Sequence, residues 1–98
     1  MIAEFSVVPI GAGESLSPYV AECLKIVRKS GLKYEFTALA TILEGDYGQV
    51  MGTIGECHMK VRSMTDRVMT SVRIDDRAGK GGDEIERKVR SVEEKLGR

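Results

Sequence analysis

The stretch KYEFTALATILEG, residues 33–45, restricts the possible folds more than any other part of the chain. Apolar and polar residues alternate over residues 33–38 and again over residues 41–44, with an interruption between the two runs. A period of two is typical of a half-buried β-strand, so the sequence predicts two consecutive strands here. Charged residues are depleted in strands, which makes Glu35 and Glu44 unusual at these positions.

Two other stretches alternate in the same way. Residues 2–9 form the first, and Pro9 with the glycines of PIGAGES ends it. Residues 67–75 form the second, and the loop RAGKGG follows it. One face of this last strand carries Val68, Thr70, Val72 and Ile74, and the other carries Met69, Ser71, Arg73 and Asp75. The chain therefore contains four predicted strands.

Apolar residues at helical spacing predict three helices. The first begins with Ser17 as the expected N-cap and Pro18 in the first turn. Gly31 is expected to end it in the left-handed conformation that glycine tolerates. The last helix begins with a capping box formed by Asp83 and Glu86. Its apolar stripe consists of Ile85, Val89, Val92 and Leu96.

The middle helix follows the second strand of the 33–45 stretch. Asp46 and Gln49 form its expected capping box. Gly52 and Gly55 lie inside the helical pattern, where each costs about 1 kcal/mol relative to alanine. The pattern predicts an amphipathic helix in spite of these glycines.

The predicted order is strand, helix, strand, strand, helix, strand, helix. Without the last helix, this is the βαββαβ order of ferredoxin-like folds. The sequence therefore predicts an α+β protein: a single ferredoxin-like domain over residues 1–98 with an additional C-terminal helix. Its four-stranded antiparallel sheet would have helices on one face, and the other face must meet water, a ligand or another subunit.

The open face of this sheet is expected to carry polar side chains. Because Tyr34 suits the helix side of its strand, Glu35 and Thr37 are expected on the open face, near Arg73 and Asp75 of the last strand. A face that mixes polar and apolar groups suits a partly dry cleft holding a polar ligand between subunits. An ordinary cross-strand ion pair between Glu35 and Arg73 is the alternative interpretation.

The composition argues against several classes of protein. Fifteen Lys and Arg balance fifteen Asp and Glu, so no broad attraction to nucleic acid or to an anionic membrane is expected. No stretch has the pattern of a signal peptide or a membrane span, so we expect a cytoplasmic protein. Cys23 and Cys57 each lie in a helical apolar pattern, and we interpret them as buried hydrophobic residues rather than a disulfide framework.

Several familiar sites fit the sequence poorly. The GAG at residues 11–13 lies between a strand and a helix, as in a dinucleotide-binding turn, but Leu16 stands at the third glycine position. The loop at residues 79–82 has only part of a phosphate-loop motif, and a plain loop is favoured over anion binding by Lys80. His58, the only histidine, is expected at the edge of the core rather than in a metal site.

Two functions of ferredoxin-like domains are also disfavoured. Metal chaperones of this architecture carry a CxxC in the first loop, and this loop has no cysteine. RNA-binding domains need aromatic residues on the open sheet face with a basic surround. This chain has few aromatic residues and a balanced charge.

Four stretches together resemble the small thiamine-binding protein family, formerly a family of uncharacterised short proteins. They are AEFSVVPIG, SPYVAECL, KYEFTALATILEG and VRIDDRAG, and the resemblance covers essentially the whole chain. It implies a ferredoxin-like subunit that pairs into dimers and commonly assembles as a homotetramer, a dimer of dimers. It also implies binding of thiamine or its pyrimidine part, as some members do.

Thiamine joins an aminopyrimidine, which donates and accepts hydrogen bonds, to a permanently cationic thiazolium. A carboxylate can accept from the amine or balance the cation, and Glu35 and Glu44 are the candidates. Hydroxyls, a tyrosine ring for stacking or a cation–π contact, and an arginine complete the expected set. The predicted ligand-binding residues are Tyr34, Glu35, Thr37, Thr41, Glu44, Tyr47, Arg73, Asp75 and Arg77. We predict no catalytic residue, cofactor or metal.

Two alternatives to ligand binding stay open. In the first, the protein is a structural or regulatory homo-oligomeric module, and the polar groups of the sheet fix the register of the assembly. In the second, it is an enzyme acting on a thiamine precursor. The sequence offers no nucleophile with a partnered base and no metal set for such an enzyme.

Overall fold

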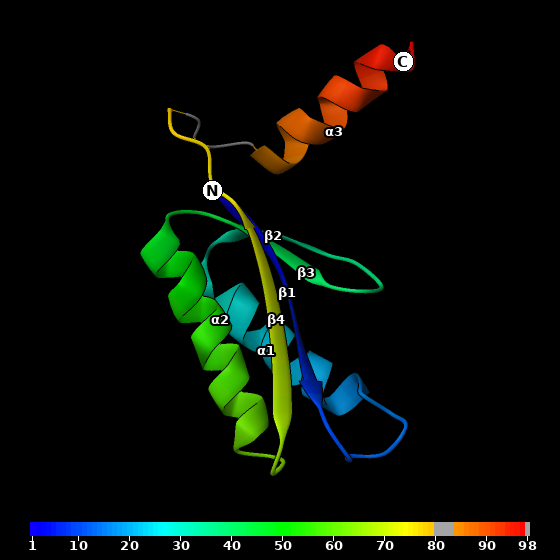
Figure 1. Cartoon of the computed structure of the whole chain (residues 1–98), viewed down its shortest axis with the longest axis vertical. Coiled ribbons are helices and arrows are strands. Elements are labelled where there is room, and N and C mark those ends of the chain that lie inside the picture. Colours follow the sequence, from blue (N-terminus) through cyan, green and yellow to red (C-terminus); the bar gives the residue numbers. More distant parts are fainter. Residues whose placement is uncertain (80–83, 98) are drawn as a thin grey trace.

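A computed structural model describes residues 1–79 and 84–97 of the chain (Figure 1). The elements in chain order are β1 (Ile2–Pro9), α1 (Ser17–Ser30), β2 (Lys33–Phe36), β3 (Thr41–Glu44), α2 (Tyr47–Arg62), β4 (Val68–Asp75) and α3 (Glu84–Lys95). This order confirms the predicted ferredoxin-like α+β fold with an additional C-terminal helix.

The sheet has the strand order β2-β3-β1-β4, and each neighbouring pair is antiparallel. β1 pairs with β4 from Ile2 to Pro9, but with β3 only from Ile2 to Phe5. The second half of β1 therefore has no strand partner on its β3 side.

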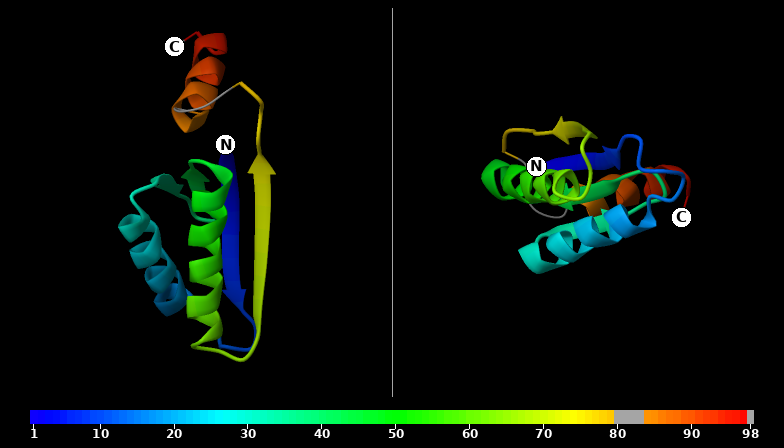
Figure 2. Two further views of the ribbon diagram at one scale, coloured as in Figure 1. Left: turned by 90° about the vertical axis from the view of Figure 1, so that its left-hand side faces the viewer. Right: turned by 90° about the horizontal axis from the view of Figure 1, so that it is seen from below.

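Helices α1 and α2 cover one face of the sheet, as the two views in Figure 2 show. Alternate strand residues point to this face, where Ala3, Phe5 and Leu43 are buried. His58 lies at the edge of the core, as predicted, with its Nδ1 2.7 Å from the Thr70 hydroxyl. Met1 is also buried, and the helices contribute six further buried apolar residues: Cys23, Val27, Val50, Ile54, Cys57 and Val61. Full burial of an aliphatic side chain stabilises a fold by about 1.5–3 kcal/mol.

The N-terminus of α1 differs from the prediction. Leu16, not Ser17, occupies the N-cap position, and no side chain caps the helix. The reason is that the Leu16 carbonyl already accepts hydrogen bonds from the amides of Tyr19 and Val20. The predicted C-terminus is confirmed, because Gly31 has a left-handed φ of 76°.

The predicted cap of α2 is confirmed, since the Asp46 carboxylate accepts a hydrogen bond from the Gln49 amide at 2.9 Å. The predicted cap residue of α3, Asp83, lies outside the described residues, as does Lys80 of the glycine-rich loop.

Helix α3 lies beyond the end of the sheet and extends away from the two-layer body (Figure 1). Contacts with the body involve its first turns: Ile85 N to Glu44 Oε1 at 2.9 Å, Glu86 Oε1 to Lys33 Nζ at 2.9 Å, and Lys88 Nζ to Asp75 Oδ2 at 2.8 Å. Farther along, Val89, Val92 and Leu96 are exposed. The molecule measures 46 × 28 × 20 Å.

Candidate functional site

The candidate site is a cavity beside the half of β1 that β3 leaves unpaired. The turn at residues 37–40 and the N-terminal half of α1 border this gap, and a space of about 160 Å³ is left. In an antiparallel strand, alternate residues turn their N–H and C=O groups to opposite sides. Part of the main chain between Ser6 and Pro9 is therefore directed to this side without a strand partner. The cavity exists because β1 is longer than β3.

The lining of this cavity is mainly apolar and carries a few polar groups. Its larger apolar members are Phe5, Val7, Val8, Leu16, Val20, Phe36 and Leu39, and its polar members are Ser6, Cys23, Thr37 and Thr41. Small-molecule sites typically combine an apolar wall with a few polar groups that fix the orientation of the ligand.

Thr41 has the most informative hydroxyl in this lining. It is the first residue of β3, pairs with Phe5 on the helix-covered face, and is only 8% exposed. Within the described part of the chain, its hydroxyl makes no hydrogen bond. Among the described residues, the fully buried side-chain atoms without a hydrogen-bond partner are Glu84 Oε2 and Arg87 Nε, so the Thr41 oxygen itself is not fully enclosed. The Thr41 hydroxyl is therefore available to a ligand.

Thr37 shapes the rim of the cavity. Its Oγ1 donates to the Ala40 carbonyl at 2.8 Å and accepts from the Ala40 amide at 3.1 Å. These bonds form a turn, so β2 ends at Phe36 instead of continuing to Ala38 as the alternation suggested. Side-chain to main-chain bonds of threonine compete with strand pairing, which explains the difference.

Arg73 and Asp75 lie on the open face of the sheet, outside the cavity. One row of paired residues crosses that face in the order Glu35, Ile42, Glu4 and Arg73. Glu35 and Arg73 thus lie on opposite edges, about 14 Å apart at the usual strand spacing. Their expected proximity is wrong because β3 and β1 separate β2 from β4. Arg73 pairs instead with Glu4, with Nη2 and Oε1 2.8 Å apart.

Glu44 is buried at the far end of β3 and contacts α3. Its Oε1 accepts a hydrogen bond from the Ile85 amide at 2.9 Å, which satisfies one of the free amides at the start of that helix. The neighbouring Glu84 is also buried, with its Oε2 3.6 Å from the Met1 ammonium. The structure therefore places Glu44 in a helix-anchoring contact, away from the cavity.

Most other predicted residues are exposed. The Tyr34 hydroxyl accepts a hydrogen bond from Arg28 Nε at 3.3 Å, and Tyr47 lies exposed at the start of α2. Arg77 is exposed after the end of β4.

Asp75 belongs to the contacts of α3. Its hydrogen bond with Lys88 lowers the pKa of the Asp75 carboxyl, and the charge of the same lysine adds to the effect. Of the predicted set, the structure brings only Thr37 and Thr41 together in the cavity.

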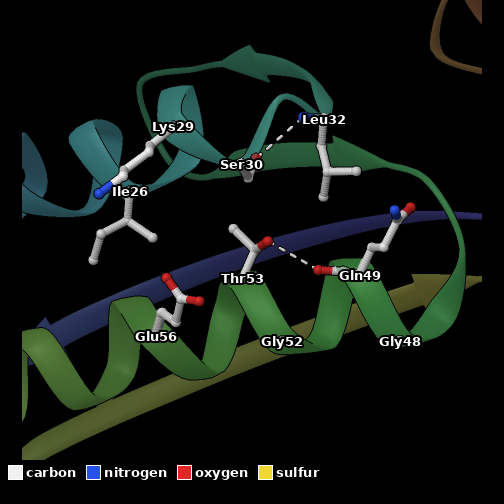
Figure 3. A pocket seen from close by; sticks show the side chains of 9 residues that line it. All are labelled: Ile26, Lys29, Ser30, Leu32, Gly48, Gln49, Gly52, Thr53 and Glu56. Carbon is white, nitrogen blue, oxygen red and sulfur yellow. Dashed lines mark hydrogen bonds between the residues drawn. The ribbon is translucent and has the colours of Figure 1, made fainter.

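A larger and shallower hollow lies between α1 and α2 (Figure 3). Its volume is about 610 Å³, and Gly48 and Gly52 leave it open because they carry no side chain. The buried Thr53 faces this hollow, but its hydroxyl donates to the Gln49 carbonyl at 2.8 Å. Its most buried hydroxyl therefore already has a partner.

The sequence analysis missed Ser6, Val20, Cys23 and Phe36 as members of the site. A usable signal was present in the predicted strand lengths. The first strand spans residues 2–9 and its neighbour only residues 41–44, so the two cannot pair over their full lengths.

Comparisons with known proteins identify the family of this chain. The sequence model described as "Thiamine-binding protein" matches residues 3–93. The chain belongs to the thiamine-binding protein family. Two curated family relatives are the UPF0045 protein MJ1052 of Methanocaldococcus jannaschii, 38% identical over 94 residues (96% of this chain, 93% of the relative), and YqgV of Bacillus subtilis, 34% identical over 101 residues (97% and 96%).

Solved structures agree with this family membership. The crystal structure of MJ1052 superposes with a TM-score of 0.87 at 39% identity and covers 95% of each chain. A Thermotoga maritima protein named for thiamine biosynthesis or salvage gives a TM-score of 0.80 at 25% identity over 93% of this chain and 96% of that one.

Two further features were sought in the structure: a membrane-spanning helix and a metal site. Across residues 1–79 and 84–97, no helix has the length and apolar character needed to cross a membrane. The same residues contain no group of three or more His, Cys, Asp and Glu side chains placed to hold a metal ion.

Proposed function

We propose that this protein is a non-enzymatic binding protein for thiamine or a related aminopyrimidine, whose ring occupies the cavity beside β1. The observation that carries the proposal is the hydroxyl of the buried residue Thr41, which lines a mainly apolar cavity and has no hydrogen bond within the described chain. Membership of the thiamine-binding family supports the class of ligand. The name of the Thermotoga maritima neighbour supports it as well.

The volume of the cavity suits a single six-membered ring. An engineered apolar cavity of about 150 Å³ holds benzene, and this cavity measures about 160 Å³. The faces of a pyrimidine would pack against Phe36 and the aliphatic lining. Its amine and ring nitrogens would bond to Thr41 and to the unpaired main chain of β1. Burying an unpaired charge is costly, so the thiazolium cation would stay outside.

The open face offers a place for that cation. A neighbouring hollow shares Phe5, Ser6, Leu39 and Ala40 with the cavity. Glu4 and Arg73 also line this hollow. Glu4 is therefore favoured as the acid that balances a thiazolium. Glu35 and Glu44 line neither the cavity nor this hollow.

Isothermal titration calorimetry with thiamine and with 4-amino-5-hydroxymethyl-2-methylpyrimidine tests the proposal. Thr41→Val keeps the shape of the side chain and removes the hydroxyl. Loss of one hydrogen bond, about 1 kcal/mol, should weaken binding roughly fivefold. Thr53→Val is the matched control, because Thr53 is equally buried but its hydroxyl bonds to Gln49. This control should leave the affinity for both compounds unchanged.

Three outcomes would overturn the binding proposal. The first is no heat from the unmodified protein at millimolar ligand. The second is equal weakening by the two valine substitutions. The third is unchanged affinity in Thr41→Val. The first outcome would favour the alternative function, a structural or regulatory homo-oligomeric module.

We further propose that the protein is a homo-oligomer in which α3 packs against a second copy. From Ile85, the exposed residues Val89, Val92 and Leu96 follow at intervals of four, three and four, the spacing of a coiled-coil seam. A helix of this length is marginal in water unless its apolar side is packed. The homotetramer that the family resemblance implies is the assembly to look for.

Native mass spectrometry tests the assembly. Val92→Glu should produce smaller species than the unmodified protein while circular dichroism shows an unchanged helix and strand content. A monomeric unmodified protein, or an assembly that Val92→Glu leaves intact, would contradict the role of α3.

A further inference from the structure

We propose that Cys23 and Cys57 form a redox-active thiol pair, in which a hydroperoxide that enters the cavity oxidises Cys23 and Cys57 resolves the product into a disulfide between α1 and α2. The inference rests on the placement of the two thiols and does not depend on the identity of the ligand proposed above.

The two cysteines face each other where α1 and α2 pack. The Cys23 Sγ lies 4.0 Å from the Cys57 carbonyl oxygen, and the Cys57 Sγ lies 3.6 Å from the Cys23 carbonyl oxygen. Each thiol is therefore directed at the main chain of the other cysteine. Both are free thiols. This reciprocal arrangement brings side chains 34 positions apart in sequence to one point in the core.

Access to the two thiols is unequal. Cys23 lines the cavity beside β1, whereas Cys57 is 0% exposed and lies behind it in the core. A small oxidant in the cavity therefore reaches Cys23 first. The cavity, large enough for a single ring, admits a small alkyl hydroperoxide and excludes a protein oxidant.

The pKa shifts of the two thiols also favour reaction of Cys23 before Cys57. A hydrogen bond between the two side chains lowers the pKa of Cys23, although burial and the charge of Glu22 oppose the effect. The same bond raises the pKa of Cys57, and burial raises it further. Thiolates are the nucleophiles, so Cys23 is the attacking sulfur.

The chemistry balances with a hydroperoxide as the oxidant. The Cys23 thiolate attacks the distal oxygen of ROOH, the O–O bond breaks, and RO⁻ leaves and takes a proton to become ROH. Cys23 is now a sulfenic acid, oxidised by two electrons. The Cys57 sulfur then attacks the Cys23 sulfur and the S–O bond breaks. The departing hydroxide combines with the Cys57 proton as water, and the disulfide is complete.

The test treats the reduced full-length chain with tert-butyl hydroperoxide, unfolds it in N-ethylmaleimide, and measures intact and peptide masses. We expect an intramolecular Cys23–Cys57 disulfide, with loss of two hydrogen atoms and no maleimide on either cysteine. Peptide mapping separates this product from oxidation of the exposed Met59. Maleimide on both cysteines, sulfinic acid at Cys23 with Cys57 still labelled, or disulfide-linked dimers would each overturn the proposal.

Two variants separate the roles of the thiols. In Cys57→Ala, dimedone should trap a sulfenic acid at Cys23, because the resolving thiol is gone. In Cys23→Ala, Cys57 should stay reduced, and its oxidation at the unmodified rate would contradict the assigned order.

A measurement on the unmodified protein covers the case in which these variants fail to fold. Under native conditions, iodoacetamide should label Cys23 much faster than Cys57, and equal rates would contradict the proposal. Saturating thiamine should slow the oxidation of Cys23 only if thiamine occupies the cavity, so this arm separates the two proposals.

Discussion

The cavity beside β1 and the hollow between α1 and α2 differ in a way that their sizes do not reveal. The hollow is the larger, about 610 Å³ against about 160 Å³. Thr53 in the hollow and Thr41 in the cavity are 7% and 8% exposed. The Thr53 hydroxyl has a partner in the Gln49 carbonyl, whereas the Thr41 hydroxyl has none in the described chain. A hydroxyl that borders a cavity and has no partner indicates a binding site better than volume does.

The two spaces also arise for different reasons. The hollow is open because Gly48 and Gly52 remove side chains from one face of α2. The cavity is open because β1 extends past the end of β3, which leaves main-chain groups as well as a hydroxyl without partners. The second origin leaves hydrogen-bonding groups without strand partners, and such groups can give a small polar ligand its orientation.

Filling each space in turn should separate them most strongly. Val20→Phe places a ring in the cavity and should reduce thiamine binding below detection in calorimetry. Gly52→Leu fills the hollow, where no heavy atom obstructs a new Cβ, and should leave binding unchanged. Loss of binding in Gly52→Leu with retention in Val20→Phe would move the site to the hollow. Thermal unfolding of both variants checks that they fold.

Removing the aromatic wall of the cavity should have a smaller effect. Phe36→Leu keeps an apolar side chain and removes the ring face, and an aromatic contact of about 1 kcal/mol corresponds to roughly fivefold weaker binding. Tyr34→Leu is the matched control on the same strand, because Tyr34 lies outside the cavity. Equal effects of the two substitutions would remove Phe36 from the site.

The hollow should tolerate a change that stabilises the protein. Gly52 is an exposed position inside α2, and a Cβ there meets no heavy atom within 4 Å. Gly52→Ala should therefore raise the free energy of unfolding by about 1 kcal/mol, measured with urea, while thiamine affinity stays the same. A loss of stability would show that the glycine is required by packing.

The smallest expected effect concerns the anchoring of α3, far from both spaces. The pKa of Asp75 is lowered in the folded state by Lys88, so this contact stabilises the fold above the unfolded pKa and is lost as the pH falls through the folded pKa. NMR titration should give Asp75 a pKa below 3.8 that rises toward 3.8 in Lys88→Met. An unchanged pKa in this variant would exclude Lys88 as the cause.

Much of the fold could be predicted from the sequence because its signals are local. Period-two runs and the Asp46 and Gly31 termini gave the elements in the correct order. The end of β2 could not be predicted from alternation, because the Thr37 hydroxyl bonds to Ala40 only when the turn closes. The alternation of apolar and polar residues shows which face of a strand each side chain occupies. It does not show a hydrogen bond that closes a turn.

The candidate site was harder to predict because it depends on strand order and strand length. Glu35 and Arg73 share a face, but two strands separate them. Glu44, predicted as a ligand-binding residue, instead bonds to the start of α3. The Thr41 hydroxyl is available because no other described group bonds to it. The order of residues in the sequence does not show this.

The most direct test of the account is a chemical-shift map in which 4-amino-5-hydroxymethyl-2-methylpyrimidine is titrated into the isotope-labelled protein. The account predicts that the largest shifts occur around Thr41, Phe36 and Val20, beside the unpaired half of β1. Shifts that instead centre on Gly48, Gly52 and Thr53, or no shifts at millimolar ligand, would contradict it.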